Sequence, residues 1–212
     1  MKLTHTISLI IGLFVCSTAF CQSKFTTVSD AKKPEIIQSI SNASKQNKTL
    51  TCDFVQEKTS TLVADKANSK GKMYFQNPRC LRWEYTNSYG LIVNNDEVVV
   101  IDSKGSVSQA NNPRVFKELA NIIMSTIDGS GLNDSKNFTT SVSQSDTEYL
   151  VKLVPTNKRI ASVYKSIQLK VNKQTKLANS IAMFETNGDS MTITFSNHKT
   201  NQTLDSKLFK TK

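Results

Sequence analysis

The sequence predicts an α+β domain built mainly from antiparallel strands. Apolar and polar residues alternate with a period of two through much of the chain, as they do in strands with one buried face. Short polar turns separate these stretches, which favours antiparallel pairing of consecutive strands. Two other segments repeat their apolar residues at helical spacing. With 212 residues, of which 38% are hydrophobic, the chain is long enough for one domain with a substantial core.

The first residues have the pattern of a secretory signal peptide. An apolar run over residues 7–15 follows a short basic start, and small residues occupy positions −3 and −1 of a cut after Cys21. The run is too short to span a bilayer. We therefore expect residues 1–21 to be removed and residues 22–212 to form a single exported domain. Lipidation of Cys16 or Cys21 is the alternative, although lipid-modified cysteines usually follow a small residue and these two do not.

Two segments are expected to form amphipathic helices. The first follows Pro34, which suits the first turn of a helix, and the second follows Pro113 and ends at Gly129. Their apolar stripes are Ile36, Ile37, Ile40 and Ala43 in the first, and Val115, Phe116, Leu119, Ile122, Ile123 and Ile127 in the second. Each stripe needs an apolar surface to cover. The helices either complete a packed α+β core or form a lid over the concave face of a curved sheet, and periodicity does not separate these arrangements.

Strand-like alternation covers two blocks of the chain. Its segments are residues 50–57, 72–75, 81–85, 91–93, 97–101, 138–142, 148–154, 166–171, 177–185 and 191–195. The loop Asn94-Asn95-Asp96 and the pair Asn187-Gly188, which is typical of a type I′ turn, predict hairpins. Such short connections predict an antiparallel meander, in which each strand pairs with the next.

The residue inventory argues against most catalytic and metal-binding sites. After Cys21 the chain has a single histidine, His198, and it has no zinc-type Cys/His cluster, nucleophile elbow or phosphate-binding loop. We expect His198 to lie on the surface, and we expect no metal or cofactor. The carboxylates Asp53, Glu57 and Glu84 alternate with apolar residues, which predicts a solvated strand face. A small secreted enzyme that uses these carboxylates is the less favoured alternative.

Cys52 and Cys80 are expected to remain free thiols, although an exported protein with two cysteines invites a disulfide. Cys52 lies in the first predicted strand and Cys80 begins the third. In a meander the second strand lies between them, at a separation of roughly 9.5 Å. Bridged cysteines have Cα atoms only about 4.4–6.8 Å apart.

The order of several short motifs resembles that of one known family. The motifs are Phe54-Val55-Gln56, Gly71-Lys72-Met73-Tyr74-Phe75, Asn77-Pro78-Arg79-Cys80-Leu81-Arg82-Trp83-Glu84-Tyr85 and Leu91-Ile92-Val93. With the preceding helix, they resemble the periplasmic lipoprotein carrier LolA, and residues 150–155 are similar to the LolA-like proteins common in Bacteroidetes. The resemblance covers essentially all of residues 22–212. It implies a strongly curved, unclosed β-barrel with helices over the mouth.

The resemblance also implies a non-catalytic carrier in the periplasm. Such a carrier would take acylated lipoproteins from an inner-membrane exporter to an outer-membrane acceptor. Burial of acyl chain contributes about 0.8 kcal/mol per CH₂, so a lipid anchor needs a shield when it crosses water. An apolar cavity supplies the shield, and a lid keeps the empty cavity from exposing a large apolar patch. The closest alternative is the same fold with another cargo, for instance a glycolipid or a lipid-linked pigment.

Apolar residues of the early strands are expected to line the cavity, and residues of both helices are expected to cover it. The expected lining is Phe54, Met73, Phe75, Leu81, Trp83 and Tyr85, and the expected lid is Ile36, Ile40, Phe116, Leu119 and Ile123. The alternative is that these side chains simply fill a dry core.

The resemblance implies a polar contact near Pro78 that holds the lid closed. The alternatives are a lid held mainly by apolar contact of the two helices, and a solvated Arg79 that has no partner. In the family, an arginine before the proline of this motif has this role, and this chain has Asn77 there. Arg79 is the candidate replacement because it would point to the same side of a strand as Asn77, whereas Arg82 would share the opposite face with Glu84.

The chain is basic, with 27 Lys+Arg against 17 Asp+Glu and a formal net charge of +10. The basic residues are spread along the sequence without interleaved aromatic residues, so nucleic acid is not an expected partner. A solvated surface accounts for the charge, and weak attraction to anionic headgroups or an acidic partner is the functional alternative. We expect a monomer.

Overall fold

The computed structural model describes residues 24–62, 66–95, 97–109 and 113–212. For residues 113–119 it describes the helical backbone and not the side chains. The expected signal segment, residues 1–21, therefore lies outside the described residues. Within the described ranges, no helix is long and apolar enough to cross a membrane.

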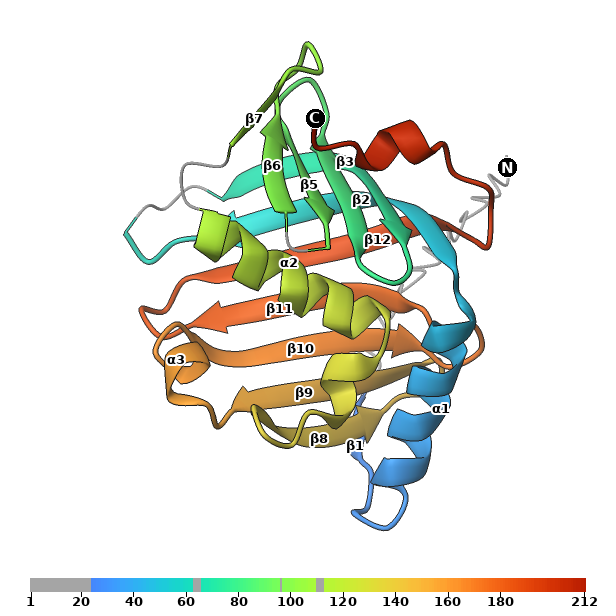
Figure 1. Ribbon diagram of the computed structural model, residues 1–212. Helices are drawn as coiled ribbons and strands as arrows, with labels where there is room; N and C mark the ends of the chain where they lie inside the picture. Colours follow the sequence, from blue (N-terminus) through green and yellow to red (C-terminus); the bar gives the residue numbers. More distant parts are fainter. Residues whose placement is uncertain (1–23, 63–65, 96, 110–112) are drawn as a thin grey trace, which may run out of the picture.

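Twelve strands of the described chain form one antiparallel sheet (Figure 1). They are β1 Thr26–Thr27, β2 Thr49–Thr59, β3 Ala67–Gln76, β4 Cys80–Tyr85, β5 Gly90–Asn94, β6 Glu97–Ile101, β7 Val107–Gln109, β8 Phe138–Gln144, β9 Glu148–Pro155, β10 Tyr164–Asn172, β11 Ala178–Glu185 and β12 Ser190–Thr200. Their order in the sheet is β1-β8-β9-β10-β11-β12-β2-β3-β4-β5-β6-β7. Because β1 and β7 end the sheet without pairing with each other, the barrel is not closed, as expected.

The strand order departs from a single meander. β2 to β7 form one meander and β8 to β12 form another, in agreement with their short turns. However, β7 and β8 lie near opposite edges of the sheet, and β12 pairs with β2 instead, for example at Phe195 opposite Phe54. Local alternation shows which segments are strands, but it carries no information on pairing between distant parts of the chain. The expectation of one continuous meander was therefore wrong at this junction.

The two long helices form where the sequence predicts them. α1 spans Lys33–Gln46 with Pro34 in its first turn, and α2 spans Pro113–Ile127. In Figure 1, α2 crosses one face of the sheet, and α1 stands beside one end of the β8–β12 half. Three short helices complete the fold: α3 Lys158–Ala161 and the 3₁₀ helices η1 Ser130–Asn133 and η2 Ser206–Phe209.

The hairpin at Asn187-Gly188 forms, but it does not contain a type I′ turn. Only Gly188 has a positive φ (93°), whereas a type I′ turn needs positive φ at both central residues. The amide of Gly188 donates to the carbonyl of Glu185 at 3.2 Å. This is a longer loop in which a left-handed glycine follows a turn.

The second predicted hairpin forms at Asn95. Asn94 pairs with Glu97 across β5 and β6, and Asn95 adopts a φ of 54°.

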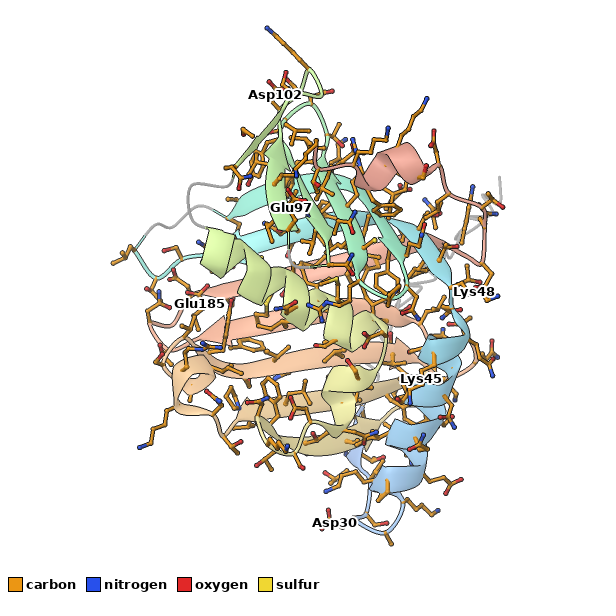
Figure 2. All side chains as sticks on the ribbon, in the orientation of Figure 1. Asp30, Lys45, Lys48, Glu97, Asp102 and Glu185 are labelled. Atoms are coloured by element: carbon orange, nitrogen blue, oxygen red, sulfur yellow. The ribbon has the colours of Figure 1, made fainter. Side chains whose placement is uncertain are left out.

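The C-terminal residues cross the outer face of the sheet at β4 and β5. The Arg82 guanidinium donates to the carbonyl of Leu208 at 3.0 Å, and the Asn94 amide donates to the carbonyl of Phe209 at 3.1 Å. Phe209 is buried. Charged side chains extend from the outside of the molecule on all sides, with Asp30 and Asp102 at opposite ends (Figure 2).

Candidate functional site

The inward-facing side chains of the sheet form one apolar interior. All six residues expected to line a cavity belong to it: Phe54, Met73, Phe75 and Leu81 are each 1% exposed, Trp83 is 5% exposed, and Tyr85 is partly buried against them. They come from β2, β3 and β4 at alternate positions, which places them all on one face. The sequence pattern therefore predicted which side chains face the interior, and their role in lipid binding stays a prediction.

An aromatic cluster forms the centre of this surface. The rings of Phe54 and Trp83 stack with centroids 4.0 Å apart, and Tyr85 meets Phe54 edge-on at 5.4 Å. Gly71 lies opposite Phe54 in the strand pairing, and a Cβ atom there would come within 2.7 Å of the Phe54 ring. A residue without a side chain at position 71 therefore allows the Phe54 ring to lie over β3 and reach Trp83.

Both long helices contribute to the same interior. Ile40 of α1 and Ile123 of α2 are buried in it, and Ile36 packs against it partly buried. These are three of the five residues expected in the lid. The side chains of the other two, Phe116 and Leu119, lie outside the described residues.

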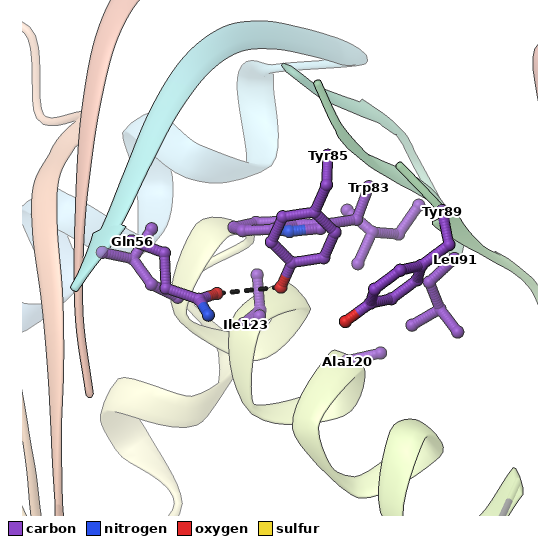
Figure 3. A pocket seen from close by; sticks show the side chains of 9 residues that line it. Gln56, Trp83, Tyr85, Tyr89, Leu91, Ala120 and Ile123 are labelled. Carbon is purple, nitrogen blue, oxygen red and sulfur yellow. Dashed lines mark hydrogen bonds between the residues drawn. The ribbon is translucent and has the colours of Figure 1, made fainter. Parts of the chain in front are cut away.

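A small cavity lies where α2 meets β4, β5 and the outer end of β2 (Figure 3). We call it the aromatic cavity; its volume is about 40 Å³, and it is lined by Gln56, Leu81, Trp83, Tyr85, Tyr89, Leu91, Ala120, Ile123 and Ile193. The Tyr85 hydroxyl donates to Gln56 Oε1 at 2.9 Å, and the rings of Tyr85 and Tyr89 are 5.0 Å apart. Burial raises the pKa of Tyr85, so its hydroxyl remains a neutral donor. No charged residue lines this cavity.

A second cavity lies between the two helices and the opposite part of the sheet. We call it the helix-end cavity; its volume is about 20 Å³, and it is lined by Ile40, Ser44, Leu50, Cys52, Met73, Thr126, Ile127, Val171, Lys176, Leu177, Ala178, Phe195 and His198. Burial raises the pKa of Cys52 to about 12, so this thiol is neutral. Both cysteines of the described chain are free, and β3 lies between their strands, which confirms the prediction.

His198 lines the helix-end cavity, and the expectation of a surface histidine was wrong. The pairing of β12 with β2 shifts register between Ser196 and Lys199, and Asn197 adopts a φ of 54°. This bulge breaks the alternation and leaves His198 half-buried, with its Nε2 atom 3.1 Å from the carbonyl oxygen of Ala178. Burial also lowers its pKa, so the ring is neutral at neutral pH.

The interior is closed in this conformation. Pockets that hold small ligands usually have volumes of about 300–1,000 Å³, whereas the two cavities measure about 40 and 20 Å³. Phe54 and Phe75 line neither of them. The packed-core alternative therefore describes the interior as it stands.

A polar contact joins the turn between β3 and β4 to α2 at the surface. Arg79 Nη2 donates to Asn121 Oδ1 at 3.0 Å, and Asn121 belongs to α2. The side chain of the candidate latch residue thus reaches the lid helix. Asn77, at the position of the family's arginine, is exposed, and its backbone amide donates to the carbonyl of Lys48.

The carboxylates singled out in the sequence lie on the outer face of the sheet. Glu84 accepts from Arg82 Nε at 2.6 Å, and Asp53 lies 3.8 Å from the Lys72 ammonium. Glu57 is exposed. The structure does not bring these three together as an acid/base pair, and within the described ranges no three His, Cys, Asp or Glu side chains are grouped to hold a metal ion.

Several residues of the two cavities were not predicted. Gln56 follows Cys52 and Phe54 at every second position of β2, so the alternation indicates that it faces inward. Because Gln56 is polar, it was not counted among the inward-facing residues. Lys176 and His198 lie in a turn and a bulge, where alternation gives no direction.

Comparison with known proteins identifies a family for this chain. Residues 45–212 match the family model described as outer membrane lipoprotein carrier protein LolA. No curated protein sequence matches the chain. Similar solved structures include a LolA superfamily protein from Nitrosomonas europaea, with 12% identity and a TM-score of 0.44 over 82% of this chain and 97% of that chain. MucB in its complex with MucA from Pseudomonas aeruginosa has 11% identity and a TM-score of 0.50 over 84% and 60%. The lipoprotein LppX from Mycobacterium tuberculosis has 10% identity and a TM-score of 0.47 over 84% and 100%.

These structures are at most 12% identical to this chain, so the assignment depends on the family model alone. That model covers most of the chain, including α2 and the strands β2 to β12, whereas β1 and nearly all of α1 precede the matched residues. The chain therefore belongs to the LolA family of outer membrane lipoprotein carriers.

Proposed function

We propose that this protein is a periplasmic, non-catalytic carrier that binds the acyl chains of lipoproteins in its interior and moves them from the inner to the outer membrane. The observation that carries the proposal is the apolar interior between an unclosed sheet and two helices, with small cavities at separate places along it. Membership of the LolA family supports it. An inner-membrane exporter and an outer-membrane acceptor are the partners that this role requires.

Cargo loading would exchange one set of apolar contacts for another. Movement of α2 away from the sheet would expose residues such as Ala120 and Ile123, which are buried in the closed form. Acyl chains would cover the same surface and contribute about 0.8 kcal/mol per CH₂. Opening without cargo therefore costs free energy, because apolar surface is exposed to water, and this cost keeps the empty carrier closed. When cargo enters, burial of its acyl chains offsets the cost.

The polar groups of the aromatic cavity would orient the cargo. The hydroxyl of Tyr85 bonds to Gln56 in the closed form. When that contact opens, the Tyr85 hydroxyl can donate to a carbonyl group that attaches an acyl chain to a lipoprotein's N-terminal cysteine, and Gln56 Oε1 can accept from an amide N–H of that cysteine. A buried donor and acceptor would then keep partners in both forms.

A binding assay with a synthetic triacylated lipopeptide and delipidated protein tests the proposal. Wild-type protein should bind the lipopeptide and should not bind the same peptide without acyl chains. Leu91→Glu, which places a carboxylate in the lining of the aromatic cavity, should abolish binding because that charge would lose its water against acyl chain. The matched control is Val55→Glu on the outer face of β2, where the side chain is 48% exposed, and it should bind normally.

Two readouts separate the alternatives. Mass spectrometry of the bound lipopeptide should recover it intact, and a cleaved product would favour an enzyme. Lipids that co-purify with the protein from periplasm should be acylated peptides, whereas a glycolipid or pigment would favour the same fold with another cargo. Equal binding by wild type and Leu91→Glu would contradict the assignment of the interior.

A further inference from the structure

The two cavities of the interior differ in charge. The aromatic cavity is lined by neutral residues alone. The helix-end cavity has a lysine, Lys176, and a neutral histidine, His198, in its lining, and no carboxylate is among the residues that line it. An uncharged acyl chain forms no ion pair or hydrogen bond with an ammonium group. Acyl-chain binding alone therefore does not explain a lysine in the lining of this cavity.

Lys176 is held at this position by its own turn. It lies between β10 and β11 with a φ of 58°, and its backbone amide donates to the carbonyl of Asn172 at 2.9 Å. Its ammonium donates to the carbonyl of Lys173 at 2.6 Å and lies 5.1 Å from the centre of the Tyr149 ring. The side chain is partly buried, and the residue lines the cavity.

A second ammonium lies over the same ring. Lys173 Nζ is also 5.1 Å from the centre of Tyr149, and it donates to the neutral Gln144 side chain at 3.0 Å. The neighbouring carboxylate, Glu148, accepts a hydrogen bond from Asn179 at 2.8 Å. Among the ion pairs found in the described parts of the chain, neither lysine takes part.

Two ammonium groups from one turn are therefore held against the same tyrosine ring with neutral partners, and one of them belongs to a residue that lines the helix-end cavity. Like charges repel, and partial burial weakens the screening by water. An anionic group that bonds to them would offset the repulsion through charge-assisted hydrogen bonds, which are stronger than bonds between neutral groups.

We propose that the helix-end cavity binds an amphiphile with a single acyl chain and an anionic head, either a carboxylate or a phosphate. The head lies at Lys176 and Lys173, and the acyl chain extends into the interior past Met73 and Phe195. This proposal rests on the proposed function in one respect, because it needs an interior that opens to acyl chains. It goes beyond that function because the ligand carries a negative charge and is no lipoprotein.

Binding can be measured on the full chain through Trp83, the chain's single tryptophan, which is stacked on Phe54 within the interior. The probes are palmitate, 1-palmitoyl-lysophosphatidylglycerol and 1-hexadecanol, and titration calorimetry gives an independent affinity. The first two should bind at least about tenfold more tightly than the neutral alcohol, as expected for charge-assisted hydrogen bonds. Preference for one of the two anionic probes would identify the head as carboxylate or phosphodiester.

Lys176→Gln should weaken binding of the anionic probes about tenfold and leave hexadecanol unchanged. The matched control is Lys170→Gln, because Lys170 also lies over an aromatic ring, that of Phe25 at 5.9 Å, but is exposed on the outer face of β10. That variant should bind all three probes as wild type does. Equal affinity of wild type for palmitate and hexadecanol, or equal weakening of all three probes by Lys176→Gln, would overturn the proposal.

The failure of this proposal is distinguishable from failure of the proposed function. If the triacylated lipopeptide binds but no anionic preference is seen, the carrier function stands and the head-group site is wrong. If neither the lipopeptide nor hexadecanol binds, the interior does not accept acyl chains, and both proposals are wrong.

Discussion

Single residues decide how the interior is filled, and Gly71 is the clearest case. Gly71→Ala would place a Cβ against the main-chain oxygen of Glu84 and within 2.7 Å of the Phe54 ring. Overpacking of this kind typically costs about 1–3 kcal/mol. Urea unfolding should show a loss in that range, whereas Ser69→Ala, at an exposed position two residues earlier in β3, should change the free energy of unfolding by less than about 0.5 kcal/mol. Similar losses for both would mean that the packing of Phe54 does not depend on Gly71.

The two thiols should differ in reactivity in the folded protein. Cys52 is buried and Cys80 is partly exposed, and burial raises the pKa of both. In a chain that starts at residue 22, a thiol reagent at pH 8 should leave Cys52 unmodified and react slowly with Cys80. Both should react after denaturation without a reductant. A titre of zero in denaturant would reveal a disulfide, which the order β2-β3-β4 does not allow.

Cys52 should also make stability depend on alkaline pH. Its pKa is about 12 in the folded protein against an ordinary value of 9.0. Between these values the unfolded chain releases a proton that the folded chain keeps, so the free energy of unfolding falls as pH rises. The contribution is fully present below pH 9 and is lost toward pH 12. Urea unfolding of wild type and Cys52→Ala at pH 8 and 10 should show the steeper fall in wild type, and parallel falls would contradict the buried thiol.

Residue-level prediction from sequence succeeded where alternation is regular. The inward positions of β2 to β4 were identified because Leu81 and Trp83 repeat every second residue in a strand with one buried face. His198 is half-buried and not at the surface because it lies within a bulge, and a bulge has no signature in the alternation of apolar residues.

At the scale of elements, length decided what the sequence could predict. The helices and the ten longer strands carry enough residues to show a period, so the first helix and the strand at residues 81–85 were placed within a few positions. β1 and β7, with two and three residues, are too short to show one. Their pairing depends on neighbours that lie far away in the chain, so local pattern could not reveal them.

The contact between the β3–β4 turn and α2 should control the lid. Arg79→Leu removes the hydrogen bond from Arg79 Nη2 to Asn121. Because this contact is exposed, the free energy of unfolding should change by less than about 0.5 kcal/mol. Release of a bound triacylated lipopeptide should nevertheless change in rate, because the contact exists only in the closed form.

Two variants test whether the pair acts as a unit. Asn121→Ala should reproduce the effect of Arg79→Leu, and the double variant should add nothing. Asn77→Ala is the matched control and should leave release unchanged, because its backbone amide makes the hydrogen bond to Lys48. Unaltered release in Arg79→Leu would mean that apolar packing alone holds α2 on the sheet.

At the scale of the whole molecule, topology explains why a helix covers the interior. β7 and β8 lie near opposite edges of the sheet, so the chain between them must cross from one side to the other. α2, with 15 residues, spans about 22 Å of that path. The sequence predicted both the helix and its apolar stripe. The path of the helix across the sheet follows from the pairing of β12 with β2, and local sequence patterns do not indicate which distant strands pair.

Cargo should loosen the helices and leave the sheet intact. The closed interior offers cavities of about 40 and 20 Å³, far below the size of an acyl-chain site, and the covering helix lies on the sheet without hydrogen bonds of a β-ladder. The described backbone of α2 should therefore exchange its amide protons with deuterium faster when a triacylated lipopeptide is bound. Amides of β10 and β11, paired on both sides, should stay protected. The unacylated peptide is the control, and it should change nothing. If exchange in α2 is the same with and without lipopeptide although the lipopeptide binds, the acyl chains must enter by a path that leaves α2 in place, and the lid would then have to be sought in α1.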